Sequence, residues 1–378
     1  MKKYILIILT VLIAVFGVIY YVNNNHKPVD PEEEVIEDGY EIEHEERFGG
    51  VYIKISIDDF NELGYEYGDS VDISFSNGYE MTDIPYYNGY YVDEGEPLLV
   101  AYPGYPYIKV TLNYGDDLWY LTELEEGDKT TVELREKGTY LDNQKARDIH
   151  YSDEQGDKSD AEFGNFRNVK VGNMKDNILY RSASPVDNQH KRAACVDRQI
   201  AEVGVNFIIN LSDSEEDLVT HINKDDFNSP YFLSLYEKGN VIALCMSASY
   251  KTKDFNEKLV KGLTAASEHE GPYLVHCVEG KDRTGYVCML LEALAGASYQ
   301  EIVDDYMITY DNYYVINEES DPERYRLIKE KNIDIMYEHI NGKKLYGIPD
   351  LQAETKNFLM SEGMSEEAVD KLISKLSD

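Results

Sequence analysis

The sequence is poor in cysteine and in basic residues. Only four of its 378 residues are cysteines, and no two of them have the C-x-x-C spacing of a zinc knuckle. They are Cys195, Cys245, Cys277 and Cys288. A disulfide-dense scaffold is therefore excluded. Lysine and arginine number 36 against 72 aspartates and glutamates, which gives a formal net charge of −36. This excludes nucleic acid as a partner, because binding a phosphate backbone requires a basic surface.

Long apolar runs are also scarce, and the clearest one stands at the N-terminus. Lys2 and Lys3 precede residues 4–22, which contain no charged residue. A run of this length is close to the roughly 20 residues that cross a bilayer as a helix. The sequence therefore predicts a signal anchor or transmembrane helix over residues 1–23, with the rest of the chain outside the cytoplasm. A cleaved signal peptide, which would give a secreted protein, is the alternative.

Composition divides the following residues into a linker, a β domain and a second linker. Residues 24–47 are acidic and contain two prolines, which is typical of a solvated linker. Residues 48–140 contain short alternating runs separated by turn residues, and they predict a small all-β accessory domain, a barrel or a sandwich. Residues 141–162 are polar and predict a second linker. The many tyrosines of the β domain either pack its sheet or form a ligand face for a glycan or wall polymer.

The pattern changes at residue 163, where apolar strands begin to alternate with helices. Strands are expected at residues 177–182, 205–212, 240–248 and 272–277, and helices at 188–203, 252–269, 284–295 and 299–310. This alternation predicts a three-layer α/β domain over residues 163–378, with a mostly parallel central sheet. Residues 1–160 hold 12 basic and 35 acidic residues, so most of the negative charge lies outside this domain.

One motif follows the last predicted strand and precedes an apolar helix. It runs His276-Cys277-Val278-Glu279-Gly280-Lys281-Asp282-Arg283-Thr284-Gly285. Backbone amides between a strand end and a helix start form an anion-binding nest, and the helix dipole adds to it. The same field favours the nucleophilic thiolate of Cys277. Arg283 returns to the loop mouth, where its guanidinium can bind two phosphate oxygens. Gly280 allows the tight bend of this loop, and the Thr284 hydroxyl is placed to hydrogen-bond the sulfur of Cys277. The motif predicts nucleophilic attack on a phosphomonoester.

The pattern His-Cys-x5-Arg-Thr-Gly resembles the phosphate loop of the protein tyrosine phosphatase superfamily. The form HCVEGKDRTG is similar to a narrower HCxxGKDRTG branch of bacterial tyrosine and dual-specificity phosphatases, some of which also hydrolyse phosphoinositides. Further similar stretches lie at residues 166–185, 204–217, 301–313 and 358–376. The resemblance therefore covers the α/β domain and leaves the β domain unassigned.

The resemblance implies a role for each residue that matches. Cys277 would be the nucleophile that forms a cysteinyl-phosphate, and Arg283 would stabilise the phosphoryl oxygens together with the loop amides of residues 278–283. Thr284 would support the thiolate, and His276 would brace the loop. Arg181, in YRSASP, would contact the substrate or order the site. No metal or cofactor is implied.

Three aspartates are candidates for the general acid that protonates the leaving oxygen. Asp282, within the loop itself, ranks first, followed by Asp213 after a predicted strand and by Asp254. Many relatives carry this Asp on a separate mobile loop. The family also often has an Arg where this chain has Ser212, so a substrate contact from that Arg is not implied here.

The resemblance implies phosphotyrosine in a protein or peptide as the substrate. Lys281 adds a second positive charge, and a Lys at this position helps phosphatase-and-tensin-type lipid phosphatases hold an inositol headgroup. Phosphoinositides and inositol phosphates are therefore a second substrate class. The alternative is that Lys281 only faces solvent and binds no headgroup. Two other functions stay open: a secreted inositol-phosphate phosphatase similar to cysteine phytases, and a surface binding protein whose phosphatase domain only captures phosphate. Rhodaneses and arsenate reductases also use cysteine loops, but they lack the flanking matches.

Overall fold

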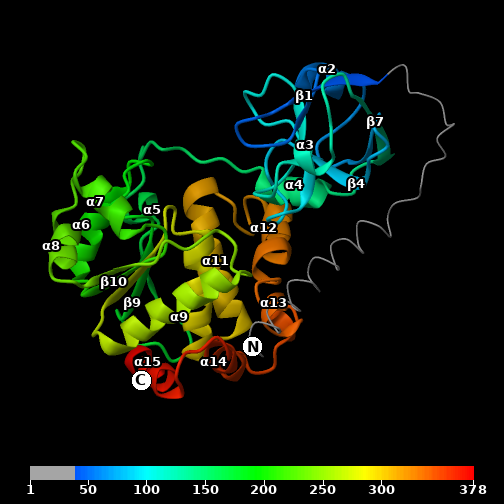
Figure 1. Cartoon of the computed structure of the whole chain (residues 1–378). Helices are drawn as coiled ribbons and strands as arrows, with labels where there is room; N and C mark the ends of the chain where they lie inside the picture. The colour runs from blue at the N-terminus through cyan, green and yellow to red at the C-terminus, as the bar shows by residue number, and fades with distance from the viewer. Residues whose placement is uncertain (1–38) are drawn as a thin grey trace, which may run out of the picture. The chain divides into compact units, whose positions relative to one another are not determined.

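The structure, a computed structural model, describes residues 39–378 of the chain. The chain divides into two units, Met1–Gln144 and Lys145–Asp378 (Figure 1). Within the described residues, no helix is long and apolar enough to cross a membrane. The anchor predicted at residues 1–23 lies outside the described residues, as does most of the acidic linker predicted after it.

The described part of the first unit is a closed β-barrel. Its strands are β1 (Tyr40–His44), β2 (Val51–Ile53), β3 (Ser70–Phe75), β4 (Glu80–Tyr87), β5 (Pro97–Val100), β6 (Ile108–Leu112) and β7 (Lys129–Glu136), in the order β1-β2-β6-β5-β4-β3-β7. Two short helices, α2 (Ile57–Glu62) and α3 (Leu118–Leu121), lie between strands. Because β7 pairs with both β1 and β3, the sheet closes without a free edge. The prediction of a small all-β domain ahead of the α/β domain is confirmed.

The linker predicted at residues 24–47 needs correction, because its last part forms strand β1. Ile42 points into the barrel core, whereas the glutamates on either side of it are exposed. The ammonium of Lys54, which directly follows β2, lies 3.8 and 3.5 Å from their carboxylates. One apolar residue in an acidic run is too weak an alternation to identify a strand from sequence. The neighbouring strands β2 and β7 supply the backbone partners that make β1 a strand.

The tyrosines of the barrel are divided between its core and its surface. Tyr86 and Tyr87 are fully buried. Tyr52, Tyr102 and Tyr105 stay partly exposed, and neighbouring rings among them have centroids 5.7 and 5.4 Å apart. The buried tyrosines pack the sheet, as one of the two predicted roles requires. A ligand that binds the partly exposed tyrosines stays a prediction.

The second unit, Lys145–Asp378, is built on a five-stranded sheet. Its strands β8 (Arg167–Val169), β9 (Leu179–Ser182), β10 (Phe207–Asn210), β11 (Val241–Ala243) and β12 (Tyr273–His276) lie in the order β11-β10-β12-β9-β8. All neighbours are parallel except β8, which pairs with β9 in the antiparallel sense. His276 is in register with Asn210 and Ser182, so three strands end together at one edge. The predicted mostly parallel sheet is confirmed.

Helices cover both faces of this sheet (Figure 1). On one face, α6 (Ala193–Val203), α7 (Glu215–Ile222) and α8 (Pro230–Glu237) pack on Ile208 and Leu274. On the other face, α9 (Lys253–Glu268) and α10 (Asp282–Leu294) pack on Ile209 and Val275. Successive residues of a strand thus face opposite layers, as the pleat requires, and the predicted three-layer arrangement is confirmed. The other helices are α11 (Tyr299–Tyr314), α12 (Pro322–Ile328), α13 (Glu338–Asn341), α14 (Leu351–Ser361) and α15 (Glu366–Leu376), with short turns at Lys329–Ile333 and Leu345–Gly347.

The linker predicted at residues 141–162 needs correction at both ends. It begins with α4 (Leu141–Arg147) and ends in α5 (Asp160–Phe163). The Ser159 hydroxyl accepts the backbone N–H of Glu162, whose carboxylate accepts the Ser159 N–H, and this reciprocal cap starts α5. Polar residues that cap or cover short helices have the composition of a linker, which explains the wrong boundary.

Candidate active site

Cys277 lies where the central strand of the sheet meets a helix. Strand β12 ends at His276 and α10 begins at Asp282, so the residues between them form the connecting turn. Residues 277–283 are called the phosphate loop below. Cys277 is 3% exposed, and the loop leads into the amino end of α10, whose dipole favours an anion. The strand–loop–helix context expected for this motif is therefore present.

Gly280 lets the phosphate loop approach the end of β9 very closely. Its φ of +69° lies in the left-handed region, which glycine adopts without strain. A Cβ at this position would lie 2.2 Å from the carbonyl oxygen of Ser182. No other residue can stand here without moving the loop, so the bend predicted at Gly280 is also a packing requirement.

Donors from outside the loop hold three successive loop carbonyls. The Ser184 N–H donates to Val278 at 3.0 Å, the Tyr313 hydroxyl to Glu279 at 2.6 Å, and the Asn165 and Arg181 side chains to Gly280 at 3.2 and 3.1 Å. In a trans peptide, the N–H points away from the C=O of the preceding residue. Holding these carbonyls on the outer side therefore turns the amides of residues 279–281 toward the inside of the loop, as an anion nest requires.

A buried ion pair on α11 fixes the arginine that holds Gly280. Arg181 is 1% exposed, and its Nη1 lies 2.6 Å from Asp305 Oδ2, while Arg167 Nε lies 2.8 Å from Oδ1. Burial alone would raise the pKa of Asp305, but the two guanidinium groups outweigh it and hold that pKa well below its usual range. Next to them, burial and the Asp305 charge raise the pKa of Glu292 well above its usual value. The network links α11, β9 and the phosphate loop.

Arg283 and Thr284 occupy the first turn of α10. Arg283 Nη1 donates to the carbonyl oxygen of Met246, in the loop after β11, at 2.9 Å. Thr284 is fully buried, and its hydroxyl has no hydrogen-bond partner among residues 39–378. A buried hydroxyl without a partner is unusual, and this position is compatible with the predicted contact to the Cys277 thiolate.

His276 is buried directly before the nucleophile. Its Nδ1–H donates to the carbonyl oxygen of Cys277 at 3.2 Å, and its Nε2 has no partner in the described part of the chain. Burial lowers the pKa of His276 to about 4, so the imidazole is neutral at pH 7. A neutral donor on the Cys277 carbonyl suits the predicted bracing role.

The match to a known family extends over most of the second unit. Residues 162–376, more than half of the chain, match the model of the tyrosine phosphatase family. The chain belongs to the tyrosine phosphatase family. This confirms the predicted resemblance at the level of the superfamily of cysteine-based phosphatases, while the narrower HCxxGKDRTG branch stays a prediction.

Solved structures resemble the tyrosine phosphatase domain only distantly. An uncharacterized conserved protein from Thermotoga maritima is 21% identical over 29% of this chain and 41% of its own, with a TM-score of 0.23. The core catalytic domain of the PP-IP phosphatase SIW14 from S. cerevisiae, in complex with citrate, is 19% identical over 45% of this chain and 86% of its own, with a TM-score of 0.27. Values this low say nothing about the activity. No curated protein matches the chain.

Two candidates for the general acid are exposed. Asp282 is the first residue of α10, its side chain is 60% exposed, and it lies 3.7 Å from the Lys281 ammonium. Asp254 lies in the first turn of α9, where its carboxylate pairs with Lys258 at 2.8 Å. Asp282 therefore belongs to the phosphate loop, whereas Asp254 is part of a surface ion pair on another helix.

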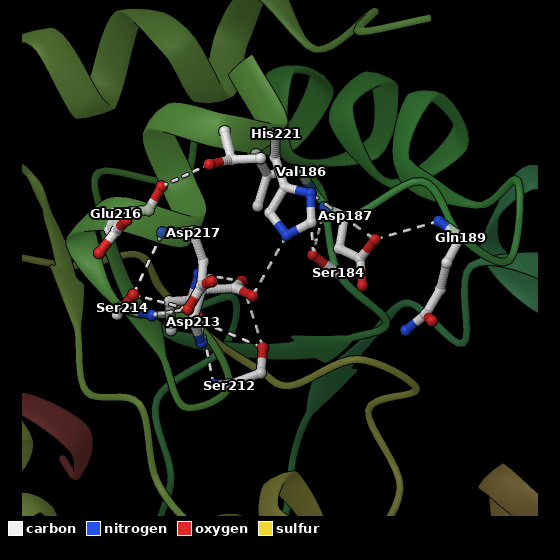
Figure 2. A network of polar contacts seen from close by, with 12 residues as sticks. Ser184, Val186, Asp187, Gln189, Ser212, Asp213, Ser214, Glu216, Asp217 and His221 are labelled. Atoms are coloured by element: carbon white, nitrogen blue, oxygen red, sulfur yellow. Dashed lines mark hydrogen bonds and ion pairs between the residues drawn. The ribbon is translucent and has the colours of Figure 1, made fainter. Parts of the chain in front are cut away.

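The third candidate, Asp213, is buried in a polar network after β10 (Figure 2). Its carboxylate accepts hydrogen bonds from Asn210 Nδ2 at 2.8 Å and from the Ser212 hydroxyl at 3.3 Å. Figure 2 shows the His221 ring between Asp213 and Asp187, with its nitrogens 3.5 and 3.8 Å from the two carboxylates. These contacts hold the Asp213 carboxylate within the loop that follows β10.

Lys281 does not extend over the loop as a free positive charge. Its ammonium lies 3.1 Å from the Glu279 carboxylate and 3.2 Å from the Tyr314 hydroxyl, and its side chain is 17% exposed. The prediction of a second cation beside the phosphate therefore needs correction, because a carboxylate of the same loop pairs with it.

Of the two roles expected of Arg181, its burial and its hydrogen bond to the outer side of the loop favour ordering the site over contacting the substrate. Sequence reasoning missed the residues that hold this part of the loop together with Arg181. Three of them lie four residues apart on α11, namely Asp305, Thr309 and Tyr313. A buried polar stripe at this spacing is a detectable signal. Asn165 has a φ of +48° and follows Gly164, the C-cap of α5, at a place where Asn often adopts the left-handed conformation.

Proposed function

We propose that the domain over residues 163–378 hydrolyses phosphomonoesters through a cysteinyl-phosphate on Cys277, with phosphotyrosine in a protein or peptide as the substrate. Family membership supports a phosphoric monoester hydrolase. The observation that carries the proposal is the phosphate loop itself. Cys277 opens it at the end of β12, its carbonyls are held outward, and α10 begins at its far side.

The proposed reaction has two steps. The Cys277 thiolate attacks phosphorus, the S–P bond forms and the P–O bond to the leaving group breaks. Arg283 and the inward amides bind the non-bridging oxygens and stabilise the charge of the transition state. Water then attacks phosphorus and the S–P bond breaks, while a proton of the water passes to the Asp282 carboxylate that the first step leaves. Inorganic phosphate departs, and the Thr284 hydroxyl supports the regenerated thiolate.

Asp282 is the proton donor in this proposal, because its exposed carboxyl stands beside Arg283 at the start of α10. Asp282→Asn should lower kcat for phenyl phosphate, whose leaving oxygen needs a proton, by about 100-fold. The loss for p-nitrophenyl phosphate should be much smaller, because its leaving group is stable as an anion. Asp254→Asn is the control and should behave like the wild type. An equal loss on both substrates with Asp282→Asn would contradict the assignment.

The overall proposal is tested by mixing the chain with excess p-nitrophenyl phosphate in a stopped-flow instrument. We expect a burst of about one p-nitrophenolate per chain followed by slower turnover. The burst and the turnover should both be lost in Cys277→Ser and kept in Cys245→Ser, because Cys245 is an exposed cysteine outside the loop. A wild-type chain with neither burst nor turnover would overturn the proposed function.

We also propose that residues 1–23 anchor the chain in a membrane, with the phosphatase domain outside the cytoplasm. The support is the uncharged run at residues 4–22 behind two lysines. Protease added to intact cells should then remove the domain, and mass spectrometry of the mature N-terminus distinguishes an anchor from a cleaved signal. A domain that stays protected until the cells are lysed would contradict the proposed location.

A further inference from the structure

A segment that precedes the family match packs onto the tyrosine phosphatase domain next to the phosphate loop. Residues 148–158, called the strap below, contain no helix or strand and end before residue 162, where the match begins. Four strap residues make contacts that fix it. Tyr151 stacks on Tyr313, Asp153 pairs with His190 at 3.0 Å and Arg192 at 3.1 Å, Glu154 pairs with Lys191, and Lys158 donates to the Asn312 carbonyl. The strap is therefore an ordered part of the second unit.

Tyr151 connects the strap to the phosphate loop. Its ring stacks on Tyr313 with centroids 5.1 Å apart, and the Arg192 guanidinium lies 4.7 Å from its ring centre. The hydroxyl of Tyr151 lies 3.5 Å from Nε2 of His190, and the hydroxyl of Tyr313, on which Tyr151 stacks, donates to the Glu279 carbonyl oxygen at 2.6 Å. Burial alone would raise the pKa of Glu279, but the Lys281 ammonium 3.1 Å away holds it below its usual value. Glu279 is thus ionised and has partners on two sides.

Glu279 neutralises Lys281 at one side of the phosphate loop. These two residues and the neighbouring Tyr151 and Tyr314 are called the rim below. The Glu279 and Lys281 side chains are 27% and 17% exposed, and the Lys281 ammonium, 3.1 Å from Glu279, also contacts the Tyr314 hydroxyl. Tyr151 and Tyr314 lie 5.7 Å apart, ring centre to ring centre, so aromatic side chains border this ion pair. The rim is therefore bordered by aromatic rings and carries no net positive charge from its lysine.

This rim distinguishes substrates by their charge. Arg283 and the loop amides bind a single phosphate group. A second phosphate on the same molecule would meet the carboxylates of Glu279 and Asp282, while the charge of Lys281 is already paired. Like charges placed together cost free energy, and such a repulsive element is an effective way to reject a competing ligand.

We propose that the strap is part of the substrate site and that Tyr151 is a specificity-determining residue. Tyr151 stacks on Tyr313, which holds the Glu279 carbonyl, and Glu279 pairs with Lys281, so the site prefers an aromatic ester with one phosphate to a polyphosphorylated ligand. This inference rests on the proposed phosphatase activity.

The test compares KM and kcat on p-nitrophenyl phosphate and on myo-inositol hexakisphosphate for the full chain. Glu279→Gln keeps the shape of the side chain and frees Lys281, and it should lower KM for the inositol phosphate about fivefold relative to KM for p-nitrophenyl phosphate. Tyr151→Ala removes the ring that stacks on Tyr313, so it should shift the ratio of the two KM values in the same direction by a smaller factor. Adding Lys281→Met to Glu279→Gln should abolish the shift.

Tyr299→Ala is the matched control, because the Tyr299 ring also packs against another tyrosine, Tyr346, with centroids 6.1 Å apart but outside the phosphate loop. It should leave the KM ratio unchanged. Thermal melting of each variant shows that it is folded. An unchanged ratio in folded Glu279→Gln, or a shift that persists with Lys281→Met, would overturn the inference.

Failure of the proposed function gives a different result. If the wild type shows no turnover, the rim is tested by calorimetric binding of inositol hexakisphosphate to Cys277→Ser with and without Glu279→Gln. Binding about fivefold tighter with Glu279→Gln supports the role of the rim without any catalysis. Equal binding by the two proteins overturns it.

Discussion

At the scale of single residues, Gly280 holds the phosphate loop against β9 because it has no side chain. Gly280→Ala places a methyl group 2.2 Å from the Ser182 carbonyl oxygen and forces a left-handed φ on an alanine. A misplacement of the loop by about 1 Å should lower kcat/KM for p-nitrophenyl phosphate about 100-fold. Gly239→Ala, another left-handed glycine but one with open space around it, is the control and should keep the wild-type kcat/KM. Wild-type activity in Gly280→Ala would show that the loop does not need this contact.

His276 predicts how the stability of the protein depends on pH. Its pKa of about 4 in the folded state is below the ordinary value of about 6.5, so the unfolded state binds the proton first as the pH falls. The free energy of unfolding should therefore decrease between pH 6.5 and 4, by up to about 3 kcal/mol from this residue. Urea unfolding at several pH values measures it. His276→Gln should show a shallower decrease than the wild type, whereas the exposed His150→Gln should not. Identical pH profiles for all three proteins would contradict this role of His276.

At the scale of elements, the Asp305 network joins α11 and β9 to the phosphate loop. Asp305→Asn leaves the buried guanidiniums of Arg167 and Arg181 without their carboxylate. Removing one partner of a buried ion pair costs about 3–5 kcal/mol, so urea unfolding should show a loss of this size. Asp304→Asn, the exposed neighbour on the same helix, should lose less than about 0.5 kcal/mol. Equal stability of the two variants would contradict a structural role for Asp305.

The elements that sequence predicted are those with continuous apolar runs. Strand β12 and helix α10 follow directly from their composition, and so does the loop between them, because its chemistry lies in ten consecutive residues. Strand β1 could not be predicted, because its register depends on pairing with strands far along the chain. The end of α11 was placed too early because tyrosine, which is frequent there, fits both a buried and an exposed helix face.

The parts of the candidate site that sequence missed lie far from the motif along the chain. Asn165 and Tyr151 precede Cys277 by more than 100 positions. Asn165 contacts the loop directly and Tyr151 reaches it through Tyr313, by side-chain geometry that no local pattern encodes. Lys281 was placed wrongly because its partner Glu279 stands two positions away, and only the folded loop brings the two charges together.

At the scale of the whole molecule, the charge of −36 and a phosphate-binding function are compatible. The charge opposes the binding of a polyanion such as nucleic acid, yet one arginine and a ring of amides suffice for a single phosphate group. Negative charge across the rest of the molecule opposes the approach of highly phosphorylated ligands. It acts in the same direction as the neutralised Lys281 at the rim.

The central claim is that Cys277 carries the phosphate during turnover. Acid quenching of the wild-type chain during hydrolysis of a phosphotyrosine peptide, followed by digestion and mass spectrometry, tests it most directly. The account predicts phosphate on the peptide that contains Cys277, in the wild type and in Cys245→Ser, and none in Cys277→Ser. Phosphate trapped on any other residue, or turnover that survives in Cys277→Ser, would contradict it.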